Sequence, residues 1–450
     1  MKKFNVQNTY QLPISGKPST QVNVLADPDV ISVSPESLSL IKPKLLKKQG
    51  EKVQIGTPLF FDKRNPDAIW VSPAAGVIKE IVYGPRRVIL RVDIERDKKE
   101  AVVQHETLDD AALVAMEREA LVDRLIQGGL WSSLMVYPFK VAPKKEVVPH
   151  NIYVTVDQDD PFLPESDVYF DGQTEAFLLG VTALKKLTTG QVFVGVSNEN
   201  QVVYPKVSSV VTHIIEGAYP ANDPGVFIYH NKTDQKDNSA WGLRAQDVIR
   251  LGQFLSTGTY PIDRIYTVGG PMVKSPCHVK SREGVSVEHL LSGFSLTKGK
   301  TRFILGGILT GRQADKASAL SVREYGLNVL QEGQEQTFLS FMRLGAERST
   351  VSRTYLGGVM QKAAYAMSTV VNGGHRACIS CSACPEMCPV GLYPQLIMKS
   401  LHANEMEEAV QQGLLDCVDC GLCTYVCPSK IELGSDFETA KKSLFEALEQ

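Results

Sequence analysis

The stretch Cys378-Ile-Ser-Cys381-Ser-Ala-Cys384-Pro-Glu-Met-Cys388-Pro389 contains four of the nine cysteines of this chain. Its spacing returns as Cys417-Val-Asp-Cys420-Gly-Leu-Cys423-Thr-Tyr-Val-Cys427-Pro428. Each run reads C-x2-C-x2-C-x3-C-P. In this spacing three thiolates of one tight loop bind three irons of a cluster, and the fourth iron takes a ligand from elsewhere. The two runs therefore predict two [4Fe-4S] clusters near the end of the chain.

The fourth cysteine of each run decides how the ligands are shared. In two-cluster ferredoxins this cysteine crosses to the other cluster. We therefore assign cluster I to Cys378, Cys381, Cys384 and Cys427, and cluster II to Cys417, Cys420, Cys423 and Cys388. The proline after each crossing cysteine fixes φ and removes a backbone donor where the chain leaves the loop.

Zinc and disulfides explain these cysteines less well. Structural zinc sites use two C-x2-4-C pairs, whereas each run packs three cysteines into seven residues and adds a fourth at a fixed offset. Cysteines so close together would strain disulfides, and nothing else indicates an oxidising compartment. The remaining thiol, Cys277, has no base partner that the sequence can assign, so we expect no chemistry from it.

Composition excludes several classes of function. With 450 residues, 43% of them hydrophobic and 22% charged, the chain is long enough for about three globular domains. A formal net charge of −2 gives no argument for nucleic-acid binding. No window reaches the roughly 18 apolar residues of a membrane span, and the polar residues after Met1 argue against a signal peptide. We expect a cytoplasmic protein that reaches the membrane only through partner subunits.

The first domain, residues 1–105, consists of short predicted strands separated by glycine and proline. Alternating apolar residues over residues 50–59 and 72–78 resemble the barrel-sandwich fold of biotinyl and lipoyl domains. That fold usually presents a lysine for a swinging cofactor on a hairpin turn. Lys63 lies at the corresponding place but lacks the usual neighbours, so we expect a solvated turn residue in a structural domain.

The second domain, residues 106–268, is predicted to be a connector helix followed by a Rossmann-like α/β domain. A strand, a helix and a strand in quick succession indicate a parallel α/β unit. The predicted helices cover residues 107–129, 172–187 and 245–255, and the predicted strands cover residues 152–156, 191–196, 208–215, 225–229 and 264–268. Neither G-x-G-x-x-G nor G-x4-G-K-[ST] occurs in the chain. We therefore expect no flavin or NAD site here.

Two further domains complete a multidomain α+β fold. Residues 269–365 are predicted to form a β-grasp (SLBB-like) module with a helix at 285–291 and strands at 327–330 and 338–344. Residues 366–450 are predicted to form an α-helical ferredoxin domain with helices at 393–400 and 404–413. Ser435-Asp-Phe-Glu438 is a capping box that would open a C-terminal amphipathic helix, with Phe437, Ala440 and Leu444 on one face.

The order of these domains resembles the NqrA-like subunits of the sodium-translocating NADH:quinone reductases and, more distantly, the C subunit of Rnf complexes. The resemblance to the reductase subunit covers nearly the whole chain. The segments of this chain that are similar to the family are Gln11-Leu-Pro-Ile-Ser-Gly16, Ser72-Pro-Ala-Ala-Gly76 with Arg86-Arg87, Gly129-Leu-Trp131, Tyr137-Pro-Phe139, Glu175-Ala-Phe177, Gly269-Gly-Pro271 and Ser352-Arg353-Thr354.

The resemblance implies a peripheral electron-transfer subunit of a membrane-bound, ion-translocating NADH:quinone oxidoreductase, inactive when alone. Its partners would be the membrane and flavin-carrying subunits of the same complex, and a quinone would be bound at a place that no residue marks. The alternatives are an Rnf-type subunit or a non-redox docking scaffold. Characterised members of the family generally keep only part of the motif found here at residues 423–428, whereas this chain has all eight cysteines of both runs.

Overall fold

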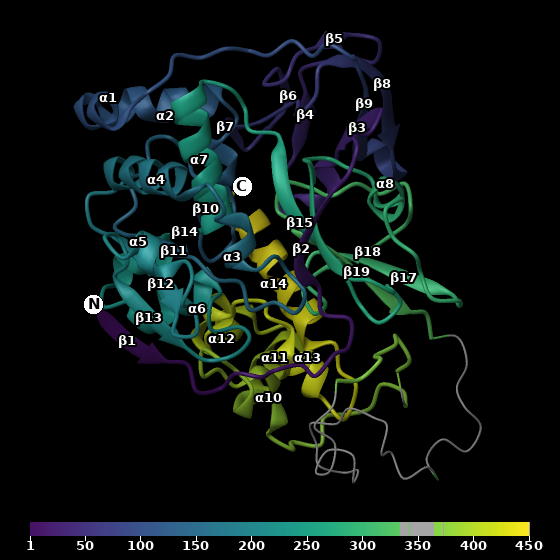
Figure 1. The fold of residues 1–450 in the computed structure, drawn as a ribbon. Helices are drawn as coiled ribbons and strands as arrows, with labels where there is room; N and C mark the ends of the chain where they lie inside the picture. The colour runs from purple at the N-terminus through teal and green to yellow at the C-terminus, as the bar shows by residue number, and fades with distance from the viewer. Residues whose placement is uncertain (334–341, 343–363, 372, 450) are drawn as a thin grey trace.

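The computed structural model describes residues 1–333, 342, 364–371 and 373–449 (Figure 1). Within these residues the strands form four sheets, and most of the helices flank the central sheet or gather at the C-terminal end of the chain. The predicted strand over residues 338–344 falls almost entirely outside the described residues, as does Ser352-Arg353-Thr354.

Two small sheets form the N-terminal β domain, in the orders β3-β9-β8-β5 and β4-β6-β7. Their strands are β3 (Val30–Val33), β4 (Pro43–Leu45), β5 (Lys52–Val53), β6 (Pro58–Asp62), β7 (Asn65–Val71), β8 (Gly76–Tyr83) and β9 (Ile89–Arg96). Alternating side chains point inward, and the buried rings of Phe60 and Trp70 stack with their centroids 5.2 Å apart. Lys63 is exposed in the turn between β6 and β7, as expected of a solvated turn residue.

The central sheet has the order β1-β13-β12-β11-β14-β10. All neighbouring strands are parallel except β10, which runs antiparallel to β14. The strands are β1 (Lys2–Asn5), β10 (Met135–Val136), β11 (Ile152–Thr155), β12 (Val192–Ser197), β13 (His213–Glu216) and β14 (Trp241–Arg244). The nearly unbroken apolar sequences of β11 and β12 suit parallel strands that are covered on both faces.

Helices cover both faces of this sheet. They are α1 (Asp110–Ala115), α2 (Arg118–Gln127), α3 (Ser166–Tyr169), α4 (Thr174–Leu187), α5 (Tyr204–Val207), α6 (Pro224–Asn231) and α7 (Ala245–Thr257). The long helices α4 and α7 pack closely because each has a glycine at the contact. A Cβ on Gly252 would lie 1.8 Å from the carbonyl oxygen of Ala176, so only glycine fits there.

Three predicted elements of this region differ from the structure. The helix predicted over residues 107–129 is divided into α1 and α2, because Met116 and Glu117 between them have extended backbone. Residues 225–229, predicted as a strand, belong to helix α6, because Asp223 caps the helix by accepting a hydrogen bond from the Gly225 amide and Pro224 fills the first turn. A short apolar run does not distinguish a buried strand from a buried helix. The strand predicted over residues 208–215 is shorter and begins at His213.

The second large sheet has the order β18-β17-β19-β15-β16-β2. Its strands are β2 (Ser19–Val24), β15 (Asp263–Gly269), β16 (Cys277–Arg282), β17 (Thr301–Leu305), β18 (Arg312–Ala314) and β19 (Gly326–Gln331), with the short helix α8 (Val287–Leu291). Strand β2 comes from the first residues of the chain and pairs in parallel with β16. The N-terminal segment therefore contributes β1 and β2 to two different sheets before it enters its own β domain.

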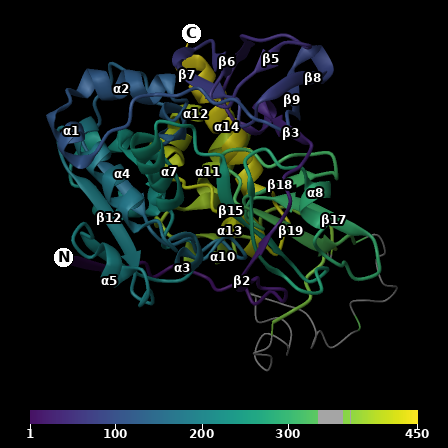
Figure 2. The same cartoon turned by 45° about the horizontal axis from the view of Figure 1, so that its top comes forward.

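The C-terminal helices pack against the central α/β domain. They are α10 (Ala383–Glu386), α11 (Pro394–His402), α12 (Met406–Gln411), α13 (Leu422–Val426) and α14 (Leu433–Leu448). One hydrophobic core joins Tyr153 and Phe227 of the α/β domain to Val418 and Phe437. In Figures 1 and 2, α14 extends from the other C-terminal helices toward β7. The ring centroid of Phe445, in the last turns of α14, lies 5.1 Å from the ring centroid of Phe139.

The predicted capping box at Ser435 is wrong, because α14 begins at Leu433. The hydroxyl of Thr424 on α13 accepts a hydrogen bond of 2.8 Å from the Gly434 amide. A free amide of the first turn is thus satisfied from a neighbouring helix rather than by a local serine. Phe437 and Ala440 are buried as expected, and Phe445 is buried beside the partly exposed Leu444.

Candidate iron–sulfur centre

The first cysteine run lines a pocket together with one cysteine of the second run. Cys378, Cys381 and Cys384 face this pocket, and the cysteine that joins them is Cys427. Cys388, the fourth cysteine of the first run, does not line it. The rest of the lining includes the apolar Met398, Ile431 and Leu433. This is the grouping that the assignment of cluster I requires.

The other four cysteines lie close enough to influence one another electrostatically. Burial is the main cause that raises the pKa of Cys417 to about 11 and that of Cys420 well above its usual value, and neighbouring cysteines add to both. For Cys420 these neighbours are Cys417, Cys423 and Cys388. Cys388 is therefore near the second run, as cluster II would need. Buried thiols of this kind give up their protons when metal binds.

The two loops share an unusual backbone. Ser380 and Ser382 in the first run have φ of 52° and 62°, and Asp419 and Gly421, at the equivalent positions of the second, have φ of 61° and 74°. A left-handed conformation costs a residue other than glycine roughly 1–2 kcal/mol. Left-handed residues at every second position turn successive backbone amides toward one side of the loop. The amides then form a concave anion-binding site of the kind that is found at iron–sulfur clusters. The Ser380 amide donates to Cys378 Sγ at 3.4 Å.

These features fit an iron–sulfur site. Among the described residues, no group of three or more His, Cys, Asp or Glu side chains converges as the ligands of a single metal ion would. In a cubane each cysteine binds a different iron, so the four sulfurs surround the cluster rather than one point. The pocket, its apolar wall and the amides that face the sulfurs match this requirement.

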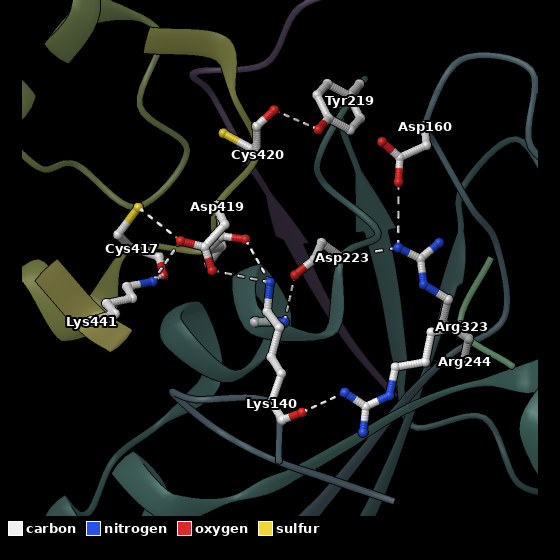
Figure 3. A network of polar contacts seen from close by, with 12 residues as sticks. Lys140, Asp160, Tyr219, Asp223, Arg244, Arg323, Cys417, Asp419, Cys420 and Lys441 are labelled. Atoms are coloured by element: carbon white, nitrogen blue, oxygen red, sulfur yellow. Dashed lines mark hydrogen bonds and ion pairs between the residues drawn. The ribbon is translucent and has the colours of Figure 1, made fainter. Parts of the chain in front are cut away.

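The second run is embedded in charged groups from other parts of the chain (Figure 3). Lys140, which follows β10, lies 3.3 Å from the Asp419 carboxylate and donates to the Val418 carbonyl at 2.9 Å. Lys441 of α14 reaches the same carboxylate at 2.7 Å and the Cys417 carbonyl at 2.5 Å. Burial raises the pKa of Asp419, but the two ammonium groups outweigh it and hold the pKa below its usual value.

Further polar contacts tie this loop to the α/β domain. The Tyr219 hydroxyl donates to the Cys420 carbonyl at 2.6 Å. Arg323 donates to the carbonyl of Lys140 at 2.7 Å, and Lys140 has a left-handed φ of 55°. Burial lowers the pKa of Lys140, but the carboxylates of Asp419 and Asp223 raise it more, so its pKa lies above the usual value and the side chain is a cation.

The sequence did not indicate these surrounding residues. Lys140 is separated from Val418 by 278 positions, and no motif marks it, Tyr219 or Lys441. Asp419 lies inside the motif, but the spacing rule treats its position as free. Cys277 lies in β16, apart from both runs, and burial raises the pKa of its thiol.

No helix in the described part of the chain is long and apolar enough to cross a membrane. Four known domain families match successive parts of the sequence. They are the NqrA N-terminal barrel-sandwich hybrid domain over residues 4–97, the NqrA second alpha/beta domain over 116–260, the NQRA C-terminal domain over 267–316 and a 4Fe-4S dicluster domain over 355–432.

Relatives that match nearly the whole chain carry the same family name. The chain is 31% identical to the A subunit of the Na(+)-translocating NADH-quinone reductase of Marinomonas sp. (strain MWYL1), over 92% of either chain. It is also 31% identical to the protein of that name from Saccharophagus degradans, over 96% of this chain and 97% of the relative. A solved NAD+-reducing [NiFe]-hydrogenase chain aligns with 52% of the structure at a TM-score of 0.35 and 11% identity.

Proposed function

Because this chain belongs to the NqrA family, the A subunits of the Na(+)-translocating NADH-quinone reductases, we propose that it relays electrons inside such a complex through two [4Fe-4S] clusters. Cys378, Cys381, Cys384 and Cys427 would hold one cluster, and Cys417, Cys420, Cys423 and Cys388 the other. The observation that supports this most directly is the pocket in which Cys427 joins three cysteines of the other run.

Each cluster would accept and release one electron at a time, at a potential that its surroundings set. The chain's own contribution is to bury or partly bury every ligand cysteine except Cys381 and to direct amides toward the sulfurs. The Ser380 amide faces Cys378 Sγ, and the Leu392 amide donates to Cys388 Sγ at 3.3 Å. Such hydrogen bonds and burial are the means by which a protein tunes a cluster.

We further propose that the protein is peripheral, on the cytoplasmic face of the membrane, and is held there by the membrane and flavin-carrying subunits of its complex. The relatives' name supports NADH as the electron donor and a quinone as the acceptor of the whole complex. The quinone is assigned to no residue of this chain.

The first experiment is an analysis of iron and acid-labile sulfide in the anaerobically purified chain, with low-temperature electron paramagnetic resonance (EPR) before and after dithionite. Two four-iron clusters require about eight irons per chain and a signal that appears on reduction. Zinc in place of iron, or iron without a redox change, would contradict electron relay and favour a scaffold that docks the membrane subunits.

A further inference from the structure

The two cysteine runs differ in the charges around them. Among the described residues, the pocket of the first run is lined by cysteines, by apolar side chains and by uncharged polar residues such as Ser380, Ser382 and Gln395. The equivalent of Ser380 in the second run is Asp419, which contacts Lys140 and Lys441. The second run therefore has Asp419 and two cations at its loop, with Asp223 also beside Lys140, whereas the residues that line the first-run pocket are uncharged.

From this difference we propose that Lys140 and Lys441 stabilise the reduced state of the cluster bound by the second run. The inference rests on the proposed function. A cluster that gains an electron becomes more negative, and burial away from water penalises that charge. A positive charge nearby offsets the penalty and raises the reduction potential, because charge near a cluster is one of the factors that set it.

The geometry holds both cations in place. Lys441 is 7% exposed, and its ammonium is fixed between Asp419 and the carbonyl of Cys417. Lys140 is 27% exposed and donates to Val418, next to Asp419. Charges held at partly buried positions act through a lower effective dielectric than surface charges, so water screens them less.

The two lysines come from different parts of the molecule. Lys441 lies on α14, within the C-terminal domain, whereas Lys140 follows β10 of the α/β sheet. Lys140 adopts the left-handed conformation, which is strained for lysine, and the hydrogen bond from Arg323 to its carbonyl helps to fix it there. The potential of the second-run cluster should therefore depend on the contact between the two domains.

If the two lysines only stabilised the loop, removing their charge would not change the reduction potential of the cluster. The test must therefore distinguish loss of the charge from loss of side-chain packing. Lys140→Met and Lys441→Met remove the charges, Lys140→Arg keeps the charge, and Lys442→Met removes a charge from the exposed face of α14. Midpoint potentials of the anaerobically purified full-length chain come from redox titrations followed by EPR. Cys420→Ala, which lacks a second-run ligand, identifies the signal of each cluster.

We expect each Met variant to lower the equilibrium constant for one-electron reduction of the second-run cluster about tenfold, which corresponds to a midpoint potential lower by about 59 mV. Lys140→Arg and Lys442→Met should leave it close to wild type, and the first-run cluster should stay unchanged in every variant. Potentials that shift equally at both clusters, or at neither, would overturn the inference.

Iron analysis separates this failure from failure of the proposed function, since a wild-type chain without clusters contradicts the function itself. If Lys441→Met does not retain iron, Lys140→Met alone decides the inference, because that side chain is more exposed and its loss disturbs the fold less.

Discussion

The two cysteine runs have the same ligand spacing and the same left-handed backbone positions, yet they lie in different environments. In the first run Cys381 is exposed and Ile379 is 66% exposed. In the second, Asp419 is paired with two lysines, and Tyr219 binds the carbonyl of Cys420. The repeat specifies the spacing of the cysteines, while contacts from elsewhere in the chain make the surroundings of the two runs unequal. The two proposed clusters would therefore lie in different environments despite identical ligand types.

The largest expected effect separates the ligands of the two clusters. Cys381→Ala and Cys420→Ala should each remove one cluster, about four of the eight irons, and each should abolish a different EPR signal. Cys388→Ala should abolish the signal that Cys420→Ala abolishes, although Cys388 belongs to the first run. Iron analysis and EPR of the three variants measure this. If Cys388→Ala matched Cys381→Ala instead, each run would bind its own cluster and the crossing would be wrong.

The difference in exposure should give the clusters different lifetimes. An iron chelator or oxygen reaches the first-run site directly, because Cys381 is exposed and the pocket opens beside Ile379. We expect iron release in two phases, with the first-run signal lost several-fold faster. The time course of chelated iron, followed together with EPR, measures both phases. Cys420→Ala, which lacks the buried cluster, should retain only the fast phase.

The cysteine spacing is enough to propose the site, because three of the proposed ligands of each cluster lie in one loop and local sequence determines their placement. The charged surroundings could not be predicted in this way, since the contacts of Lys140 depend on how two domains pack. The same holds for β1, which pairs with β13 more than 200 positions along the chain. Helix α6 is a different case, because Asp223 followed by Pro224 is a local start signal that the prediction of a strand overlooked.

The ion pairs of the second run should contribute measurably to stability. Asp419→Asn leaves Lys140 and Lys441 without their carboxylate, while asparagine still tolerates the left-handed backbone. Breaking a fully buried pair costs roughly 3–5 kcal/mol, but the Asp419 side chain is 35% exposed, so we expect a loss of about 1–2 kcal/mol. Ser380→Asn, at the equivalent exposed position, should change stability by less than about 0.5 kcal/mol. Denaturant unfolding of the cluster-loaded variants gives both values, and equal losses would show that the charges do not matter.

The last comparison concerns the fifth position of each loop, which is Ser382 in the first run and Gly421 in the second. Both are left-handed, but a Cβ on Gly421 would lie 2.8 Å from the carbonyl oxygen of Leu309. Gly421→Ser should therefore cost about 1–2 kcal/mol through backbone strain and also force Leu309 to move.

The reverse change, Ser382→Gly, removes strain from an exposed loop but increases the freedom of the unfolded chain, so the two effects nearly cancel and we expect a change within about 0.5 kcal/mol. The comparison is sharp because each substitution gives one loop the residue of the other. If Gly421→Ser were as harmless as Ser382→Gly, the packing of Leu309 on the second loop would not distinguish the two sites, and charge alone would remain as the source of their difference.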